Sequence, residues 1–369
     1  MEFAIHTSEL TKGLYRAQGI VEKKTAMPIL SNVLVEAFAD GKISITATDL
    51  EVGMTGKHAA EVISAGSITI PARHLYDIVR SLPKGLVSLK KMPNNWTEVH
   101  CENIEYKMLG MAPEDFQALP DISKASLFKV DRDRLKEMID KTSYAVSNDE
   151  TRYNLNGAFL EMTGDIRFRM VATDGHRLSM LDGDLVESKT EFGDGVIIPR
   201  KGLMEIKRLI ESEDGECKLG LDGSNLVFSM DEVTVVMRLL DGQFPEYRHV
   251  VPDKQKIKLQ LDRKSFLDSL RRISILSSDR SLGVKFILSS GKLIVTTSNP
   301  DLGEAKEEIG IEYDGGEVTI GFNARYLIDA LSNIDSERVD LSLEDDLSPG
   351  VLRPADDELY TCVVMPMRI

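Results

Sequence analysis

The stretch "ATDLEVGM" (residues 47–54) returns in altered form as "ATDGHRLSM" (residues 172–180), and both copies follow an apolar run. The two aspartates, Asp49 and Asp174, stand 125 residues apart, and 125 residues further on Asn299 takes the same place in "VTTSNPDLGEA". Such a recurrence indicates either a structural unit used three times or a catalytic motif used twice. Because the third copy lacks the aspartate, the pattern favours the structural unit.

Other segments repeat at a similar spacing. The chain contains "FAIHTSELTKGLYRAQGIV" from Phe3, "FKVDRDRLKEMIDKTSYAV" from Phe128 and "LQLDRKSFLDSLRRISIL" from Leu259. Each predicts a short alternating strand, a polar N-cap residue and a helix of about three turns. The expected caps are the residues Ser8, Asp131 and Asp262.

Each opening segment precedes a predicted hairpin, a second strand and helix, and a closing run of strands. Pro71 and Pro199 are expected in the first turn of the second helices, where proline is tolerated. The fold class is therefore α+β, with three repeated domains that each consist of two β-α-β-β-β halves. Polar, proline-bearing stretches at 120–126 and 250–256 predict domains at 1–122, 127–250 and 255–369.

Composition limits the classes of function. The 369 residues are 42% hydrophobic and 28% charged, which is typical of globular chains. No apolar run approaches the roughly 20 residues of a membrane span, and "MEFAIHTSEL" has no apolar signal core. We therefore expect a cytoplasmic protein without a membrane partner. The three cysteines are far apart without a CxxC pair and no HExxH motif occurs, so neither a zinc site nor a disulfide framework is predicted.

The net charge of −15 argues against a nucleic-acid partner only if the charges are evenly distributed. The predicted helices carry basic residues at helical spacing, for example Lys12, Arg16 and Lys23 in the first helix. If the helices face a common interior, the basic residues concentrate there, and an acidic protein can hold a polyanion. Phosphate contacts of this kind do not depend on base sequence.

Domain size permits a ring around DNA. A domain of about 120 residues has a radius of gyration near roughly 14 Å, so six such domains leave a hole of about 35 Å. A duplex is roughly 20 Å across. Three domains per chain become six in a two-fold dimer, the commonest oligomer.

Nine motifs occur in an order that resembles the bacterial sliding clamps, the beta subunits of DNA polymerase III, over the full length. They are "MPILSN", "TDLE", "IPAR", "RYNLNG", "ATDGHRL", "IPRKG", "LLDGQFPEYRHVVP", "GFNARYL" and "VVMPMRI". The resemblance implies a ring-shaped head-to-tail homodimer with helices lining the hole and sheets outside. Such a ring slides on duplex DNA without sequence preference and tethers the replicative polymerase. It implies no catalytic residue and no cofactor.

The resemblance also implies a pocket between the central and C-terminal domains that binds short linear motifs. Its expected partners are the polymerase alpha subunit, the clamp loader delta subunit, and other polymerases and repair proteins. The implied pocket residues are Leu155, Thr173, Gly175, His176, Arg177, Leu178, Pro245, Val250, Asn323, Tyr326, Val363, Val364, Met365, Pro366, Met367 and Arg368.

DNA and dimer contacts are carried over in the same way. The DNA-binding residues are Lys24, Arg73, Tyr153, Arg200 and Lys201. The dimer contacts are Tyr106 and Met108 of one protomer against Ile275 and Leu276 of the other. Acidic Asp149 and Glu150 beside Tyr153 leave the contribution of that loop open, and Glu105 and His74 leave the polar rim of the dimer interface open.

Two other functions compete with the clamp. A hydrolase would use Asp174 and His176, although no Ser or Cys nucleophile pairs with them by motif. A peptide-binding scaffold would use the pocket without DNA. Loss of turnover in His176→Ala would indicate the hydrolase. DNA association that persists after charge removal at Arg73, Lys201 and Arg271 would indicate the scaffold.

Overall fold

The computed structural model describes residues 1–369 except 23–25, 123–124, 187–191, 253–254, 278–281 and 369. The chain forms two compact units, each described by itself below. Unit 1 contains Met1–Arg132 and Lys201–Leu239, and unit 2 contains Asp133–Arg200 and Leu240–Ile369.

The elements follow in the same order three times. The first repeat comprises β1 (Glu2–His6), α1 (Thr7–Ala17), β2 (Asn32–Ala37), β3 (Lys42–Thr48), β4 (Val52–Ala59), β5 (Glu61–Ser64), β6 (Gly66–Pro71), α2 (Ala72–Ser81), β7 (Leu86–Lys91), β8 (Trp96–Cys101) and β9 (Ile104–Leu109). The second comprises β10 (Phe128–Val130), α3 (Arg132–Ser143), β11 (Gly157–Met162), β12 (Arg167–Thr173), β13 (Arg177–Asp184), β14 (Val196–Pro199), α4 (Arg200–Ser212), β15 (Cys217–Asp222), β16 (Asn225–Met230) and β17 (Val233–Arg238). The third comprises β18 (Ile257–Asp262), α5 (Arg263–Ser274), β19 (Gly283–Ser289), β20 (Lys292–Asn299), β21 (Gly303–Gly310), β22 (Val318–Asn323), α6 (Ala324–Ser332), β23 (Arg338–Leu343), β24 (Gly350–Pro354) and β25 (Tyr360–Val364).

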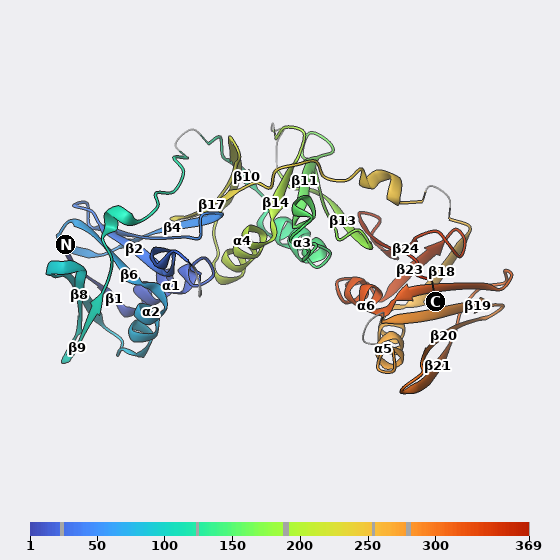
Figure 1. The fold of residues 1–369 in the computed structure, drawn as a ribbon. Helices are drawn as coiled ribbons and strands as arrows, with labels where there is room; N and C mark the ends of the chain where they lie inside the picture. The colour runs from blue at the N-terminus through green and yellow to red at the C-terminus, as the bar shows by residue number, and fades with distance from the viewer. Residues whose placement is uncertain (23–25, 123–124, 187–191, 253–254, 278–281, 369) are drawn as a thin grey trace. The chain divides into compact units, whose positions relative to one another are not determined.

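The prediction of two β-α-β-β-β halves per repeat is confirmed, with β5 as one additional strand in the first repeat. Short 3₁₀ helices lie in the connections: η1 (Pro28–Ser31), η2 (Pro93–Asn95), η3 (Pro113–Asp115), η4 (Tyr153–Leu155) and η5 (Tyr247–Val250). Helices α1 and α2 pack against each other in unit 1, and α5 and α6 do so in unit 2 (Figure 1).

The sheets join consecutive repeats through antiparallel strand pairs. In unit 1 an eight-stranded sheet has the order β10-β15-β16-β17-β4-β3-β2-β6, and a five-stranded sheet has the order β5-β1-β7-β8-β9. In unit 2 the orders are β14-β11-β12-β13-β25-β24-β23-β18 and β21-β20-β19-β22. The pairs β4–β17 and β13–β25 therefore connect one repeat to the next.

The helix boundaries correct several expectations. Asp262 caps α5 as predicted, since its carboxylate accepts from the Ser265 N–H at 2.7 Å. Ser8 is not a cap, because α1 begins at Thr7 with His6 in the cap position. Asp131 directly precedes α3. Both predicted prolines end a strand immediately before the helix instead of lying in its first turn.

The first helix has about the three turns predicted, and Lys23, expected on it, lies outside the described residues. Leu10, Leu14 and Ala17 are fully buried along one face, but α1 ends at Ala17, so Val21 lies beyond the helix. Arg16, expected on a solvent-facing basic surface, is buried and pairs with Glu213 of unit 1. Burial lowers the pKa of Arg16, and the negative charges of Glu9 and Asp231, which raise it, only partly offset this effect. This arginine stabilises packing inside unit 1 and is not available to a polyanion.

Candidate functional site

The repeated Ala-Thr-Asp motif forms a turn. In the second repeat, Asp174 Oδ1 accepts from the backbone N–H of His176 at 2.9 Å and of Arg177 at 3.0 Å. Thr173 Oγ1 accepts from the Gly175 N–H at 3.1 Å, and Gly175 has φ +88°. Glycine adopts such a φ without the steric cost of a side chain. The aspartate thus has a structural role at this position.

The other two copies use the same chemistry. Asp49 Oδ1 accepts from the backbone N–H groups of Glu51 at 2.9 Å and Val52 at 2.7 Å. Asn299 Oδ1 accepts from the Asp301 N–H at 3.0 Å. An amide oxygen serves this purpose as well as a carboxylate oxygen does, which explains why asparagine can replace aspartate in the third repeat.

Strand β13 leaves the turn and pairs with β25 near the C-terminus. Leu178 stands opposite Val363, and Arg177 stands opposite Val364. The buried residues Val171, Leu178, Tyr247 and Val363 form one apolar cluster. Phe159, Met180, Phe244, Val250 and Val251 pack around that cluster and are partly exposed. The implied pocket residues Leu178, Val250 and Val363 thus lie together in unit 2.

Arg177 is held firmly beside this cluster. Its Nε donates to Asp174 Oδ2 at 3.0 Å, its Nη1 to Asp329 Oδ2 at 2.6 Å, and its Nη2 to the Tyr144 carbonyl at 2.8 Å. The guanidinium also lies 4.7 Å from the centre of the Tyr326 ring. Burial by itself lowers the pKa of Arg177, but the bonds to Asp329 and Asp174 more than offset it, and the pKa is raised. Arg177 is therefore a fixed, charged wall of the site.

Other implied pocket residues lie in the same unit as Arg177. His176 is exposed, and its ring lies nearly parallel to that of Tyr326, with 6.4 Å between the ring centres. Asn323 caps α6, where its Oδ1 accepts from the Arg325 N–H at 2.9 Å. Leu155 is buried in η4, and Pro245 is exposed.

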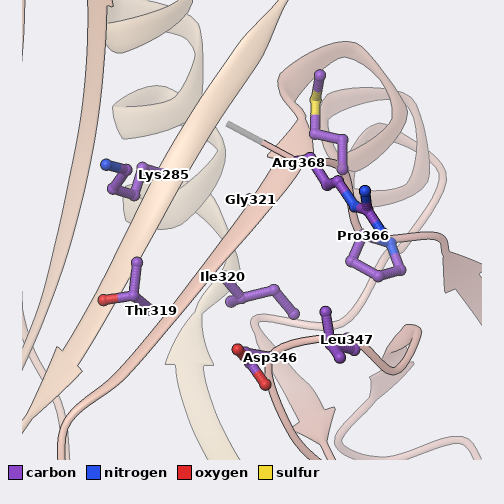
Figure 2. Close-up of a pocket in the computed structure, with 9 residues that line it drawn as sticks. Lys285, Thr319, Ile320, Gly321, Asp346, Leu347, Pro366 and Arg368 are labelled. Carbon is purple, nitrogen blue, oxygen red and sulfur yellow. The ribbon is translucent and has the colours of Figure 1, made fainter.

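The C-terminal segment is tied to both sides of the site. The Met365 N–H donates to the His176 carbonyl and the Met367 N–H to the Gly321 carbonyl, each at 2.9 Å. Beside the segment lies a cavity of about 680 Å³ (Figure 2). It is lined by Lys285, Thr319, Ile320, Gly321, Asp346, Leu347, Pro366, Met367 and Arg368.

Several of these lining residues were not among the pocket residues expected from the sequence. Ile320 and Leu347 present apolar side chains to the cavity beside Pro366 (Figure 2). Leu347 lies in the β23–β24 connection and is 74% exposed, so no strand or helix periodicity identifies it. An exposed leucine in a turn is visible as a binding feature only once the C-terminal segment is placed next to it.

The hydrolase alternative finds no support in the geometry. Both carboxylate oxygens of Asp174 are engaged, Oδ1 by two backbone N–H groups and Oδ2 by Arg177. Asp174 thus holds the turn and Arg177, while the His176 ring lies against the ring of Tyr326. The described residues include no group of three or more His, Cys, Asp or Glu side chains that could hold a metal ion. None of the described helices combines the length and the apolar character needed to cross a membrane.

The basic residues implied for DNA binding differ in their availability. Arg73 is exposed on α2, beside a cavity of about 670 Å³ that His74 also lines. Arg200 is exposed and bonds to Asn148 Oδ1. Lys201 instead forms an ion pair with buried Asp49 and donates to the Ile20 carbonyl at 3.0 Å. Lys24 lies outside the described residues.

One of the two acidic residues beside Tyr153 is paired within the loop. Tyr153 is 69% exposed. Asp149 accepts from the Thr151 hydroxyl at 2.6 Å and from Arg152 Nε at 3.0 Å. These bonds, with those to Thr151 first, lower the pKa of Asp149. Its charge is thus balanced within the loop.

The residues implied for the dimer lie at sheet edges or near them. Strand β9 is an edge of the five-stranded sheet, and β21 is an edge of the four-stranded sheet. Tyr106 is exposed on β9 and Ile275 directly after α5, whereas Leu276 is half-buried. Met108 is buried within its own unit, whereas its neighbour Leu109 is 56% exposed. Glu105 pairs with Lys107 at 3.1 Å, a bond that lowers the pKa of Glu105.

Comparison with known proteins identifies the family. The models for the N-terminal, central and C-terminal domains of the DNA polymerase III beta subunit match residues 1–120, 129–246 and 248–368. The beta sliding clamp of Pseudomonas aeruginosa is 35% identical and that of Caulobacter vibrioides 34% identical, with all of both chains covered in each case.

Solved structures agree over the same length. The DNA polymerase III subunit beta of Pseudomonas aeruginosa matches with a TM-score of 0.94 and 36% identity, covering 100% of each chain. The sliding clamp of Bartonella birtlesii, solved with griselimycin bound, matches with a TM-score of 0.94 and 34% identity, again over 100% of each chain. The chain therefore belongs to the DNA polymerase III beta subunit family, the beta sliding clamps, which are non-catalytic processivity factors.

Proposed function

We propose that this protein encircles duplex DNA as a head-to-tail homodimeric ring, slides along it and tethers the replicative polymerase. The observation that carries this proposal is the match to all three domains of one clamp family along the whole chain. The proposed domains are residues 1–122, 127–250 and 255–369, and the ranges matched by the three family models support these bounds. A protein acting on chromosomal DNA in this way works in the cytoplasm.

Contacts to DNA are assigned to exposed residues on or next to the helices. Arg73 and Arg200 present guanidinium groups that can contact phosphates, and Tyr153 presents a ring. Such contacts position a duplex without reading its bases, which suits a protein that slides. Lys24 and Lys201 complete the proposed set, although Lys201 can reach DNA only by giving up its ion pair with Asp49.

Partner proteins are assigned to the surface of unit 2 over the Leu178–Val363 cluster and beside Arg177, which we call the peptide groove of unit 2. Phe244 and Val250, which pack on buried Leu178 and Val363, supply partly exposed apolar surface, and the C-terminal segment with Met365 and Met367 borders it. Methionine side chains adapt to ligands of different shape, so one groove can serve several partners. The proposed partners are the polymerase alpha subunit, the clamp loader delta subunit, and other polymerases and repair proteins, each through a short apolar motif.

The dimer is assigned to the two edge strands β9 and β21 of different protomers. An exposed edge presents unpaired backbone N–H and C=O groups that another strand can pair with. Tyr106 and Ile275 provide exposed apolar surface at or near these edges, and Leu276 is half-buried. Met108 supports the interface from within its own sheet.

A primer-extension assay tests the tethering role. A cognate polymerase and clamp loader would extend a primer on a long single-stranded circle, with and without this protein. We expect much longer products per binding event with the intact chain. A variant lacking residues 365–369 should stay dimeric but give products no longer than polymerase alone. Equal product length with and without the intact chain would contradict the proposal.

A further inference from the structure

Unit 1 contains a groove built like the peptide groove of unit 2. It has a volume of about 310 Å³. The groove is lined by Thr48, Leu50, Glu51, Gly53, Gln117, Ala118, Leu119, Pro120, Ser224, Asn225, Val236 and Arg238. Thus the first Ala-Thr-Asp turn, strand β17 and the segment following the first repeat form its walls. We propose that this groove is a second peptide-binding site.

The two turns agree bond for bond. Leu50 N–H donates to Thr48 Oγ1 at 3.0 Å, as Gly175 N–H does to Thr173 Oγ1 at 3.1 Å. Each turn is also tied to the neighbouring strand at its end. The Arg238 N–H donates to the Glu51 carbonyl at 2.9 Å, and the Met365 N–H donates to the His176 carbonyl at the same distance.

The strand registers agree as well. Val236 of β17 stands opposite Gly53, and Val363 of β25 stands opposite Leu178. Gly53 and Leu178 are 125 residues apart, the spacing of the repeated motif. The groove of unit 1 therefore reproduces the backbone of the unit 2 groove and differs in the side chains that line it.

The floor of the unit 1 groove is made apolar by a leucine of the chain itself. A Cβ atom on Gly53 would lie 2.2 Å from Leu119 Cδ2, so a leucine methyl group already rests on the bare backbone of Gly53. Leu178 fills the corresponding position in unit 2 and is buried. The segment after the first repeat thus supplies in unit 1 the leucine that β13 supplies in unit 2, and a ligand would contact Leu119 and Leu50 as parts of the groove wall.

Leu50, at the rim of the groove, has a strained backbone conformation. It has φ +80°, close to the +88° of Gly175, and its side chain is 53% exposed. A leucine at such a φ is sterically unfavourable, and residues of this kind gather at binding sites. Nothing in the turn itself requires a side chain there, since Gly175 makes the same hydrogen bond. An exposed leucine kept at this position offers apolar contact to a ligand.

Charge selects the ligand. Glu51 takes the place that His176 has in unit 2, and its carboxylate is exposed. Arg238, the other charged side chain of the lining, already interacts with another group of the chain. The groove therefore suits an extended peptide with an aliphatic residue beside a lysine or arginine. This inference extends the proposed tethering role, because a second groove gives each protomer a second attachment point.

The test uses the full-length dimer with labelled leucine and valine methyl groups, titrated with two synthetic peptides and followed by NMR. The probes are acetyl-Gly-Leu-Lys-Leu-Gly-amide and its counterpart with Asp in place of Lys. We expect saturable shifts of the Leu50, Leu119 and Val236 methyl signals with the lysine peptide. The aspartate peptide should bind there about threefold more weakly or worse.

Two variants keep the result specific. Leu50→Gly fits the backbone without strain, so it should fold normally yet bind the lysine peptide about tenfold more weakly, because one apolar wall is lost. Glu51→Lys changes an exposed residue and should reverse the preference between the two peptides. A structural role alone would produce neither effect.

The outcomes separate this inference from the proposed function. In the variant lacking residues 365–369, the unit 1 signals should still respond to the lysine peptide. A response confined to Leu178 and Val363 methyl signals, or no saturable shift at unit 1 up to millimolar peptide, would overturn the second groove and leave the first untouched. An intact unit 1 response without any at unit 2 would contradict the tethering groove instead.

Discussion

At the scale of single residues, the side chains that attract attention in the sequence mostly support the backbone. Asp49, Asp174 and Asn299 each close a turn by accepting backbone N–H groups. Arg177 is locked between Asp174 and Asp329. Lys201 neutralises buried Asp49. Several charged side chains that the sequence suggests for catalysis or DNA binding are thus already paired with other groups of the protein.

His58 gives a pH-dependent stability. It is buried near Arg16, Glu9 and Lys12, and burial is the first cause that lowers its pKa below the ordinary 6.5, with the Arg16 charge second. Below about pH 6.5 the unfolded chain gains this proton while the folded chain does not. The free energy of unfolding should therefore fall as the pH drops, by up to about 1.4 kcal/mol per pH unit.

Urea unfolding between pH 5.5 and 8 measures this effect. In His58→Gln the titrating group is gone, so this part of the slope should disappear while the rest of the pH profile is kept. Parallel profiles for the two proteins would show that His58 does not contribute.

Arg73 and Lys201 should behave differently when replaced. Arg73 is exposed, so Arg73→Ala should leave stability unchanged and reduce the slope of log K against log salt by about 0.9, the loss of one phosphate contact. Lys201→Ala removes the partner of buried Asp49 and should cost about 1–3 kcal/mol of stability.

Fluorescence anisotropy of a labelled duplex over a range of salt gives the first quantity, and urea unfolding gives the second. A large salt-slope change without destabilisation in Lys201→Ala would mean that this lysine contacts DNA despite its ion pair.

At the scale of elements, unpaired strand edges define where a second copy can attach. Strands β9 and β21 each have a partner on one side only. Tyr106 and Leu109 expose apolar surface on β9, while Met108 points into its own sheet. Adjacent residues of a pleated strand point to opposite faces, which agrees with Met108 being buried and Leu109 exposed, whereas Tyr106 shares the face of Met108 and is 37% exposed.

An aspartate on β9 should separate the dimer. Leu109 is 56% exposed at this edge, and Leu109→Asp would place a charge in the apolar seam. Leu86 of β7 is 47% exposed in the interior of the same sheet, so Leu86→Asp is a matched control. Sedimentation velocity at micromolar concentration should show a monomer for the first variant and a dimer for the second. A dimer in both would place the interface elsewhere.

At the scale of the whole molecule, the repeat explains most of what could be predicted. The 125-residue spacing and the alternation of apolar residues are local signals, and they predicted the β-α-β-β-β order in all three repeats. Local signals cannot say what covers a helix face. Arg16 is buried because Glu213, nearly 200 residues away, lies against it, and Lys201 is engaged because Asp49 is close in space.

The same limit applies to the candidate site. The repeated motif predicted the turn itself, whereas the pocket residues of that turn and the C-terminal segment were both assigned to the site by family resemblance. Leu347, Ile320 and the groove of unit 1 were not, because each becomes a binding feature only through contacts between distant segments. The strained φ of Leu50 has no signature in the amino-acid letters.

Retention on circular against linear DNA tests the central claim most directly. The protein would be loaded onto a nicked circular plasmid with a compatible clamp loader and ATP and isolated by gel filtration at moderate salt, and the circle would then be cut at one site. A ring that encircles DNA should stay on the circle and leave once the DNA has free ends. Equal retention on the circular and the cut DNA would mean ordinary surface binding and would contradict the encircling ring.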